Sequence, residues 1–161
     1  MSKRTSYVIK GNFKRFWPEK SKRKSSLPAG WFTLNYNLVP KKLDRRHLRG
    51  SWFKIKEDNN KNVIYRILRF DPTLPGKNDK DEQMIVIDWD GWLYLTLNED
   101  EENVPKKAEL TISKANFFEV LFKASMKHPD PVYRLTFIIA VTSVLLGILS
   151  VILAIVGFIC F

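Results

Sequence analysis

The sequence predicts a mainly β fold: a small antiparallel barrel or sandwich of five to six strands, with one juxtamembrane helix and a single C-terminal transmembrane helix. Three observations predict it. Short β-rich runs separated by turn residues occupy the middle of the chain, an amphipathic helical segment follows them, and an uncharged apolar run comes last. The expected segments are a basic and aromatic N-terminal extension (1–30), a β-rich domain (31–112), a juxtamembrane helix with a proline elbow (113–131) and a transmembrane anchor (132–161).

The first strands are predicted from alternation and from turn residues. Residues 32–38 alternate, so that their aromatic and aliphatic side chains share one face. Residues 51–57 and 63–70 are rich in β-forming residues and flank the polar turn 58–61, which predicts a hairpin. A last short strand is expected over 108–112.

The segment MIVIDWDGWLYLTL, residues 84–97, predicts a second hairpin. Asp90 and Gly91 would form a type I′ turn, because that turn needs positive φ at both central residues. Trp89 would then oppose Trp92 across the two strands. Both faces of the hairpin are apolar, which indicates a central position covered on both sides, by the N-terminal arm or by the helix that follows.

That helix is predicted over residues 114–127, with Ser113 as its N-cap and no Glu or Gln at the capping-box position. The motif His-Pro-Asp-Pro at 128–131 ends it. Large apolar side chains gather on one side of this helix. They are Phe117, Phe118, Leu121, Phe122 and Met126.

The apolar run over residues 135–161 is about 27 residues long, against roughly 20 needed to cross a bilayer. Its position predicts a tail-anchored, single-pass membrane protein whose N-terminal domain folds in the cytoplasm. The start of the chain lacks an apolar secretory signal, and the one cysteine, Cys160, lies in the anchor, as expected for a reducing compartment. Near the span, Lys and Arg outnumber Asp and Glu, which favours the same orientation.

Small side chains recur in the anchor with alternating spacings of four and three. They are Thr136, Ala140, Ser143, Gly147, Ser150, Ala154 and Gly157. We call this stripe the small-residue seam. Small residues let membrane helices approach closely, and Ser or Thr hydroxyls add hydrogen bonds between them. The seam therefore predicts a homo-oligomer, or packing against the membrane helix of a partner.

Basic charge is concentrated near the N-terminus. Residues 1–50 carry 14 Lys and Arg against 2 Asp and Glu, whereas residues 51–161 carry 13 against 15. Clustered cations with interleaved aromatics favour a membrane surface or another source of phosphates. The expected residues are Lys14, Arg15, Trp17, Lys22, Arg23, Lys24, Lys41, Lys42, Arg45 and Arg46. Anionic lipid is the favoured partner because the anchor already holds the chain beside it, and nucleic acid is the alternative.

Catalytic and cofactor signatures are missing from the sequence, so no enzyme activity, metal or cofactor is expected. Asp88 and Asp90 are spaced to hold a divalent cation, but the alternative is that Asp90 forms the turn and Asp88 accepts backbone or arginine hydrogen bonds. Arg66 and Arg69 project from opposite faces of one strand, so one would meet Asp88 or line a pocket for an anionic ligand. The candidate ligand-binding residues are Arg66, Arg69, Asp88, Trp89 and Trp92.

Three functions are consistent with these features. The first is an adaptor or assembly component, in which the cytoplasmic β domain binds a protein or a small anionic ligand and the anchor self-associates. The second is a ligand-gated effector that perturbs the membrane, an architecture used in bacterial antiviral defence. The third is a membrane-tethered nucleic-acid binder. No set of named residues identifies a known family.

Overall fold

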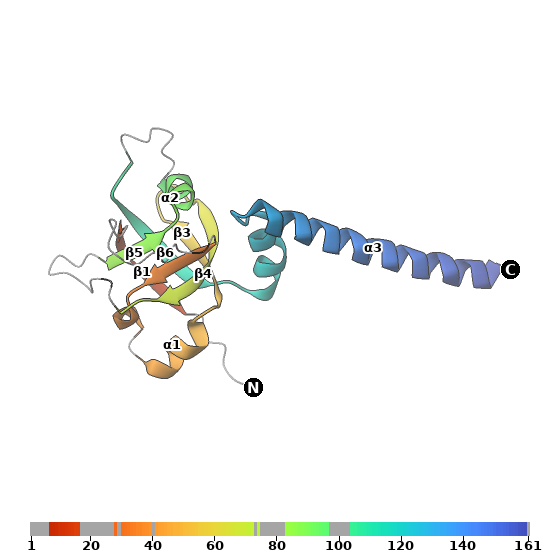
Figure 1. The fold of residues 1–161 in the computed structure, drawn as a ribbon, viewed down its shortest axis with the longest axis horizontal. Helices are drawn as coiled ribbons and strands as arrows, with labels where there is room; N and C mark the ends of the chain where they lie inside the picture. The colour runs from red at the N-terminus through yellow and green to blue at the C-terminus, as the bar shows by residue number, and fades with distance from the viewer. Residues whose placement is uncertain are drawn as a thin grey trace.

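The computed structural model describes residues 7–16, 28, 30–39, 41–72, 74, 83–96 and 104–160. A closed β barrel makes up the body of the molecule, and a long C-terminal helix projects from its side (Figure 1). The strands are β1 (Val8–Arg15), β2 (Trp31–Leu34), β3 (Trp52–Glu57), β4 (Val63–Phe70), β5 (Gln83–Ile87) and β6 (Lys107–Lys114). The helices are α1 (Lys42–Leu48), α2 (Trp89–Thr96) and α3 (Pro131–Cys160), with a 3₁₀ turn η1 (Tyr36–Leu38) and a π-helical segment η3 (Glu119–Ala124). A mainly β fold with a C-terminal apolar helix was predicted, and it is confirmed.

The strands follow the order β1-β5-β2-β4-β3-β6 around the barrel, and β6 closes it by pairing with β1. The predicted hairpin of β3 and β4 is confirmed, with Phe53 opposite Arg66. Two neighbouring pairs, β1 with β5 and β2 with β4, are parallel. The barrel is therefore mixed rather than wholly antiparallel, and its parallel pairs join segments that are far apart in the sequence.

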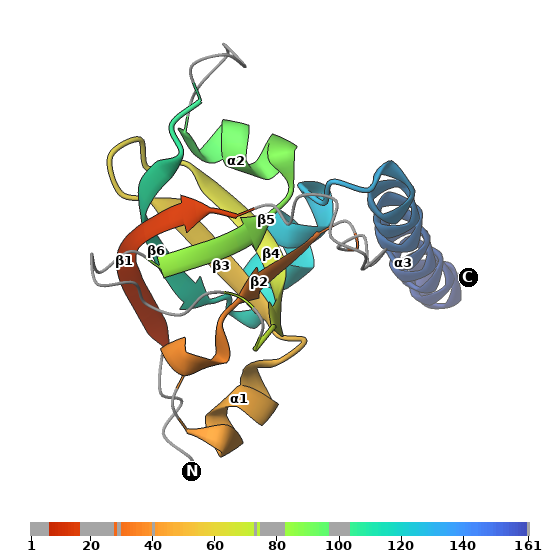
Figure 2. The ribbon, with the colours of Figure 1, turned by 60° about the vertical axis from the view of Figure 1, so that its left-hand side comes forward.

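The barrel interior is filled by alternate residues of the strands and by α2. Phe32 of β2 meets Phe53 of β3 edge to face, with ring centroids 5.9 Å apart. Helices α1 and α2 lie at opposite ends of the barrel (Figures 1 and 2). The largest fully buried side chains include Phe13, Phe32, Phe53, Trp92, Leu95 and Leu110.

The expected N-terminal extension is wrong for residues 8–15, because they form β1. This strand pairs with β6 from Val8 opposite Ser113 to Lys14 opposite Lys107. Its inward side chains are Ile9 and Phe13, with Gly11 between them and lysines facing outward. Because one of the three inward positions is a glycine, the sequence does not show the apolar and polar alternation of a strand. Its basic outward residues give it instead the composition of a solvated arm.

The predicted hairpin at residues 84–97 is also wrong. The chain forms β5 and then turns directly into α2, because Asp88 caps the helix. The Asp88 carboxylate accepts the Gly91 N–H at 2.9 Å, and the Asp88 carbonyl accepts the Trp92 N–H at 3.1 Å. Asp is among the residues preferred at N-caps, so the local hydrogen bonds favour a helix where the Asp-Gly pair had indicated a turn. Trp89 and Trp92 consequently lie on one helix and do not oppose each other across strands.

Two further boundaries differ from expectation. The strand predicted over 32–38 ends at Leu34, since the Asn35 side chain accepts the Asn37 N–H at 2.7 Å and starts η1. The helix after β6 is capped by Asn116 and not by Ser113, which belongs to β6. The Asn116 side chain accepts the Glu119 N–H at 2.8 Å, and the Glu119 carboxylate accepts the Asn116 N–H at 3.2 Å. Asn116 and Glu119 therefore form a reciprocal capping box, with Glu three residues after the cap. When Ser113 is taken as the cap, the residue three positions later is Asn116, which is why no capping box was expected.

Candidate functional site

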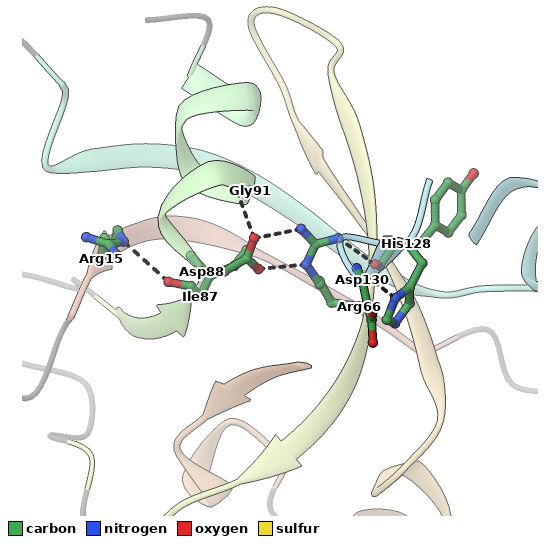
Figure 3. Close-up of polar contacts among 8 residues, drawn as sticks. Arg15, Arg66, Ile87, Asp88, Gly91, His128 and Asp130 are labelled. Carbon is green, nitrogen blue, oxygen red and sulfur yellow. Dashed lines mark hydrogen bonds and ion pairs between the residues drawn. The ribbon is translucent and has the colours of Figure 1, made fainter. Parts of the chain in front are cut away.

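Arg66 of β4 and Asp88 form a bidentate ion pair beside the first turn of α2 (Figure 3). The Arg66 Nε lies 2.7 Å from one carboxylate oxygen of Asp88, and Nη2 lies 2.8 Å from the other. The remaining guanidinium nitrogen donates to the carbonyl of Tyr65 at 2.9 Å. Arg66 is buried, so the pair joins β4 to the N-terminus of α2 inside the structure. Of the two alternatives for the strand arginines, contact with Asp88 or a ligand pocket, Arg66 takes the first.

The protonation of Asp88 follows from this geometry. Burial alone would raise the pKa of the carboxyl, but the hydrogen bonds and charge of Arg66, with the Gly91 N–H, outweigh it and lower the pKa. Asp88 is thus held as an anion whose oxygens already have donors. Both partners satisfy each other, and the arrangement suits a structural clamp better than an open binding site.

The two predicted tryptophans lie apart from any shared pocket with Arg66. Trp92 is fully buried in the barrel, and its indole N–H donates to the carbonyl of Pro105 at 2.9 Å. Trp89 is partly exposed, and the Arg15 guanidinium lies over its ring, 4.6 Å from the centroid. The five predicted ligand-binding residues therefore do not converge on one site, and their binding role stays a prediction.

Arg69, the fifth of them, lies in a hollow of about 440 Å³ on the side of the barrel. The hollow is lined by Pro28, Trp31, Arg49, Gly50 and Arg69. Two of these residues come from neighbouring strands, because β2 pairs in parallel with β4 and sets Trp31 opposite Ile67, two residues before Arg69. We call it the arginine hollow.

A tight turn brings the second arginine to the hollow. Gly50 follows α1 with a φ of 77°, a conformation that glycine adopts without a side-chain clash, and its N–H donates to the Leu68 carbonyl at 2.9 Å. Arg49 and Arg69 are exposed, and neither forms an ion pair with another residue in the described part of the chain. Sequence reasoning missed Trp31 and Arg49, and the only local signal was the Arg-Gly pair that ends α1.

The joint between the barrel and α3 is built around His128, which is buried. Its ring stacks on Tyr133 of α3 and meets Trp52 of β3 edge to face, with centroids 4.3 and 5.9 Å away. The Asp130 N–H donates to His128 Nδ1 at 3.1 Å (Figure 3). Burial, and then the charge of Arg66, lower the pKa of His128. A neutral imidazole therefore connects the barrel to the first turn of α3.

The predicted phosphate-binding cations are only partly described. Lys41, Arg45 and Arg46 lie on or beside α1, and the Arg45 guanidinium packs over the Tyr36 ring at 5.0 Å. Lys14 and Arg15 lie on β1. Trp17, Lys22, Arg23 and Lys24 fall outside the described residues, as does the side chain of Lys42. The basic residues that are described belong to different elements, so their common role as a phosphate surface remains a prediction.

The predicted anchor falls in one uninterrupted helix of 30 residues, α3. Among the described residues it is the one helix long and apolar enough to span a bilayer, and none of that apolar stretch is buried. Three hydroxyls of the small-residue seam bond within the helix. Thr136, Ser143 and Ser150 each donate to the carbonyl four residues earlier at 2.9 Å. These hydroxyls therefore add little polarity to the surface of the helix.

Comparison of the chain with models of protein families, with curated proteins and with solved structures finds no match. Within the described ranges, no group of three or more His, Cys, Asp or Glu side chains is placed to hold a metal ion. Two features therefore bear on function. They are the two arginines that line the arginine hollow and the exposed apolar surface of α3.

Proposed function

We propose that the protein is a single-pass membrane protein whose cytoplasmic β barrel binds a small anionic ligand in the arginine hollow. One observation carries the proposal: two exposed arginines, Arg49 and Arg69, line the same hollow as Trp31. One guanidinium group can donate two parallel hydrogen bonds to the oxygens of a phosphate or carboxylate group. An indole offers a flat surface for a planar or apolar part of the ligand. Clefts of about 300–1,000 Å³ are typical for small ligands, and this hollow falls within that range.

Membrane attachment is supported by the length and exposure of α3. Its 30 residues span about 45 Å at 1.5 Å per residue, which is enough for a hydrocarbon core of about 30 Å with some tilt. In water this exposed apolar surface would be unfavourable, whereas in lipid it is solvated. The basic residues Lys123, Lys127 and Arg134 near its start favour a cytoplasmic barrel.

Self-association of α3 along the small-residue seam completes the proposal, since it would gather several ligand-binding barrels on one membrane as an adaptor does. The mass of the detergent-solubilised complex tests this point. Gly147→Leu/Ser150→Leu is expected to convert an oligomer into a monomer, while the control Val144→Leu/Val151→Leu, off the seam, leaves it assembled. A monomer in every variant, or one copy bound to a different protein, would contradict self-association.

Ligand binding is tested on the full chain in detergent by calorimetry, with inorganic pyrophosphate, adenosine monophosphate and a short oligothymidylate as probes. We expect one of the two small anions to bind and Arg49→Gln or Arg69→Gln to weaken it about tenfold or more, as for loss of a charge-assisted contact. Arg46→Gln, an exposed arginine of α1 outside the hollow, is the matched control. Equal losses in all three variants would indicate general charge attraction, and preferential binding of the oligonucleotide would favour the nucleic-acid alternative.

A further inference from the structure

The helical segment 117–126, just before the anchor, exposes large apolar side chains. Phe117 and Phe118 are each 70% exposed, and the neighbours on their side are also open to solvent. The ring centroids of Phe117 and Phe118 lie 5.7 Å apart, so the two side chains form one continuous apolar surface. We call the set Phe117, Phe118, Leu121, Phe122 and Met126 the aromatic face.

The opposite side of this segment carries small and polar residues, and that side packs on the barrel. Ala124 is fully buried and Ser125 nearly so, where the segment contacts β4. The usual arrangement of an amphipathic helix on a globular domain is the reverse, with its large apolar residues inside. The aromatic face is therefore turned outward by the way the helix docks.

An ion pair joins this segment to the barrel, and hydrogen bonds within the segment hold its own shape. Lys54 of β3 forms an ion pair with Glu119 at 3.0 Å, and Glu119 also closes the capping box with Asn116. Inside the π-helical segment, the Ser125 hydroxyl donates to the carbonyl of Val120 at 3.1 Å. The first turn of the helix is thus joined to β3 by Glu119, and rotation that would bury the phenylalanines would break the ion pair with Lys54.

The aromatic face lies next to the start of α3. Only residues 127–130 separate Met126 from the start of α3, and Figures 1 and 2 show the segment between the barrel and the foot of that helix. The exposed Lys123 and Lys127 directly follow Phe122 and Met126 in the sequence, and Arg134 follows in the first turn of α3. Aromatic and apolar side chains flanked by cations are typical of helices that lie in the membrane interface.

We propose that segment 117–126 is an interfacial membrane helix, with the aromatic face inserted about 5–10 Å into the boundary between headgroups and acyl chains. The proposal rests on the membrane attachment of α3 proposed above. The interfacial helix is a second membrane contact, rigidly joined to the barrel. With α3 it sets the orientation of the barrel, and so of the arginine hollow, relative to the lipid surface.

Depth-dependent fluorescence quenching tests the proposal on the full chain. In a Cys160→Ser background, Phe118→Cys is labelled with an environment-sensitive dye and the protein is reconstituted into vesicles of phosphatidylcholine and phosphatidylglycerol. Asn60→Cys, in the turn between β3 and β4, is the control for a label in water, and Leu149→Cys, in the middle of α3, reports anchor insertion. Phe122→Cys is a second site on the same face.

We expect strong quenching at position 118 by lipids spin-labelled near the headgroup, weak quenching by lipids labelled at the chain end, and little by aqueous iodide. The label at 149 should respond most to the chain-end quencher, and the label at 60 to iodide alone. A label at 149 in lipid with labels at 118 and 122 open to iodide would overturn the interfacial helix and leave the anchor intact. Labels at 118 and 122 shielded from every quencher would show instead that a second copy or another protein covers the face. A label at 149 outside the lipid would overturn the anchor itself, and the interfacial helix with it.

Discussion

The ring of His128 stacks on the ring of Tyr133, with centroids 4.3 Å apart, at the point where the chain leaves the barrel and enters α3. The same imidazole closes against Gly30, where an added Cβ would lie 2.5 Å from Nε2. His128 therefore lies against the turn before β2, Trp52 of β3 and Tyr133 of α3. A change that perturbs this ring should loosen the connection between the barrel and α3.

We expect the stability of the barrel to fall as pH decreases through the range below 6.5. The fold lowers the pKa of His128, first by burial and then by the charge of Arg66, so the unfolded chain binds the proton more tightly than the folded one. The stabilising contribution is complete above the unfolded pKa of about 6.5 and is lost as pH falls toward the folded value. Protonation also removes Nδ1 as the acceptor for Asp130 N–H.

Melting temperatures measured between pH 7.5 and 5 check this prediction, with His128→Gln as the comparison. The charged groups that act on the ring are Arg66, Asp130 and Arg134, and they are unchanged in the variant. The wild type should lose stability over this interval and the variant should lose less. Parallel curves for the two proteins would contradict the prediction. Asp88, whose pKa is lowered from 3.8, contributes its own loss only at more acidic pH.

Gly30→Ala should destabilise the fold more than Gly50→Ala. Both glycines have positive φ, 82° and 77°, so an alanine at either site carries a backbone cost of about 1–2 kcal/mol. At Gly30 the new methyl group also collides with His128, whereas at Gly50 nothing lies within 4 Å. Chemical denaturation of both variants isolates the collision as the difference between them. Equal losses would show that the imidazole can move aside without cost.

The elements that can be predicted from the sequence are those whose structure is determined by residues close together in the chain. The β3–β4 hairpin, β6 and the apolar α3 are predictable, since alternation, a polar turn and run length lie within a few residues of each other. Strand β1 is missed because its pairing partners, β6 and β5, are distant and its inward positions include Gly11. Helix α2 is missed because Asp88 caps it, while Asp90 and Gly91 offer the competing signal of a turn.

The candidate site shows the same division. The meeting of a strand arginine with Asp88 is one of two alternatives that the sequence offers, since a buried arginine needs a carboxylate near it, but the sequence does not choose between Arg66 and Arg69. The arginine hollow is not predictable, because Trp31 reaches Arg69 only through the parallel pairing of β2 with β4. The outward aromatic face is likewise invisible in the periodicity, which places the phenylalanines on one side of a helix without showing which side meets the barrel.

Asp88→Asn should cost about 3 kcal/mol of the free energy of unfolding. It leaves the buried Arg66 guanidinium without a counter-charge, and removal of one partner of a buried pair costs about 3–5 kcal/mol. The lower end applies because the Asp88 side chain is 26% exposed. The asparagine oxygen can still cap α2, so the loss reports the ion pair rather than the cap.

The matched control is Lys54→Gln, which breaks the more exposed ion pair with Glu119. Exposed pairs contribute about 0–1 kcal/mol, so this variant should stay close to the wild type in the same denaturation experiment. A loss in Asp88→Asn no larger than in Lys54→Gln would mean that Arg66 finds another partner or reaches solvent. Such a result would also reopen Arg66 as a ligand-binding residue.

Vesicles that contain the protein should remain sealed when an anionic ligand binds. Along the small-residue seam, the hydroxyls of Thr136, Ser143 and Ser150 donate to carbonyls of their own helix, so helices packed on this seam would form a dry contact and not a water-lined path. Release of an encapsulated dye, measured before and after addition of pyrophosphate, checks this expectation. Release that depends on the ligand and disappears in Gly147→Leu would favour the membrane-perturbing effector over the adaptor. Release that persists in Gly147→Leu would point to a general disturbance of the bilayer by reconstitution. Val144→Leu, off the seam, is the control that distinguishes an effect of the seam from an effect of any substitution in α3.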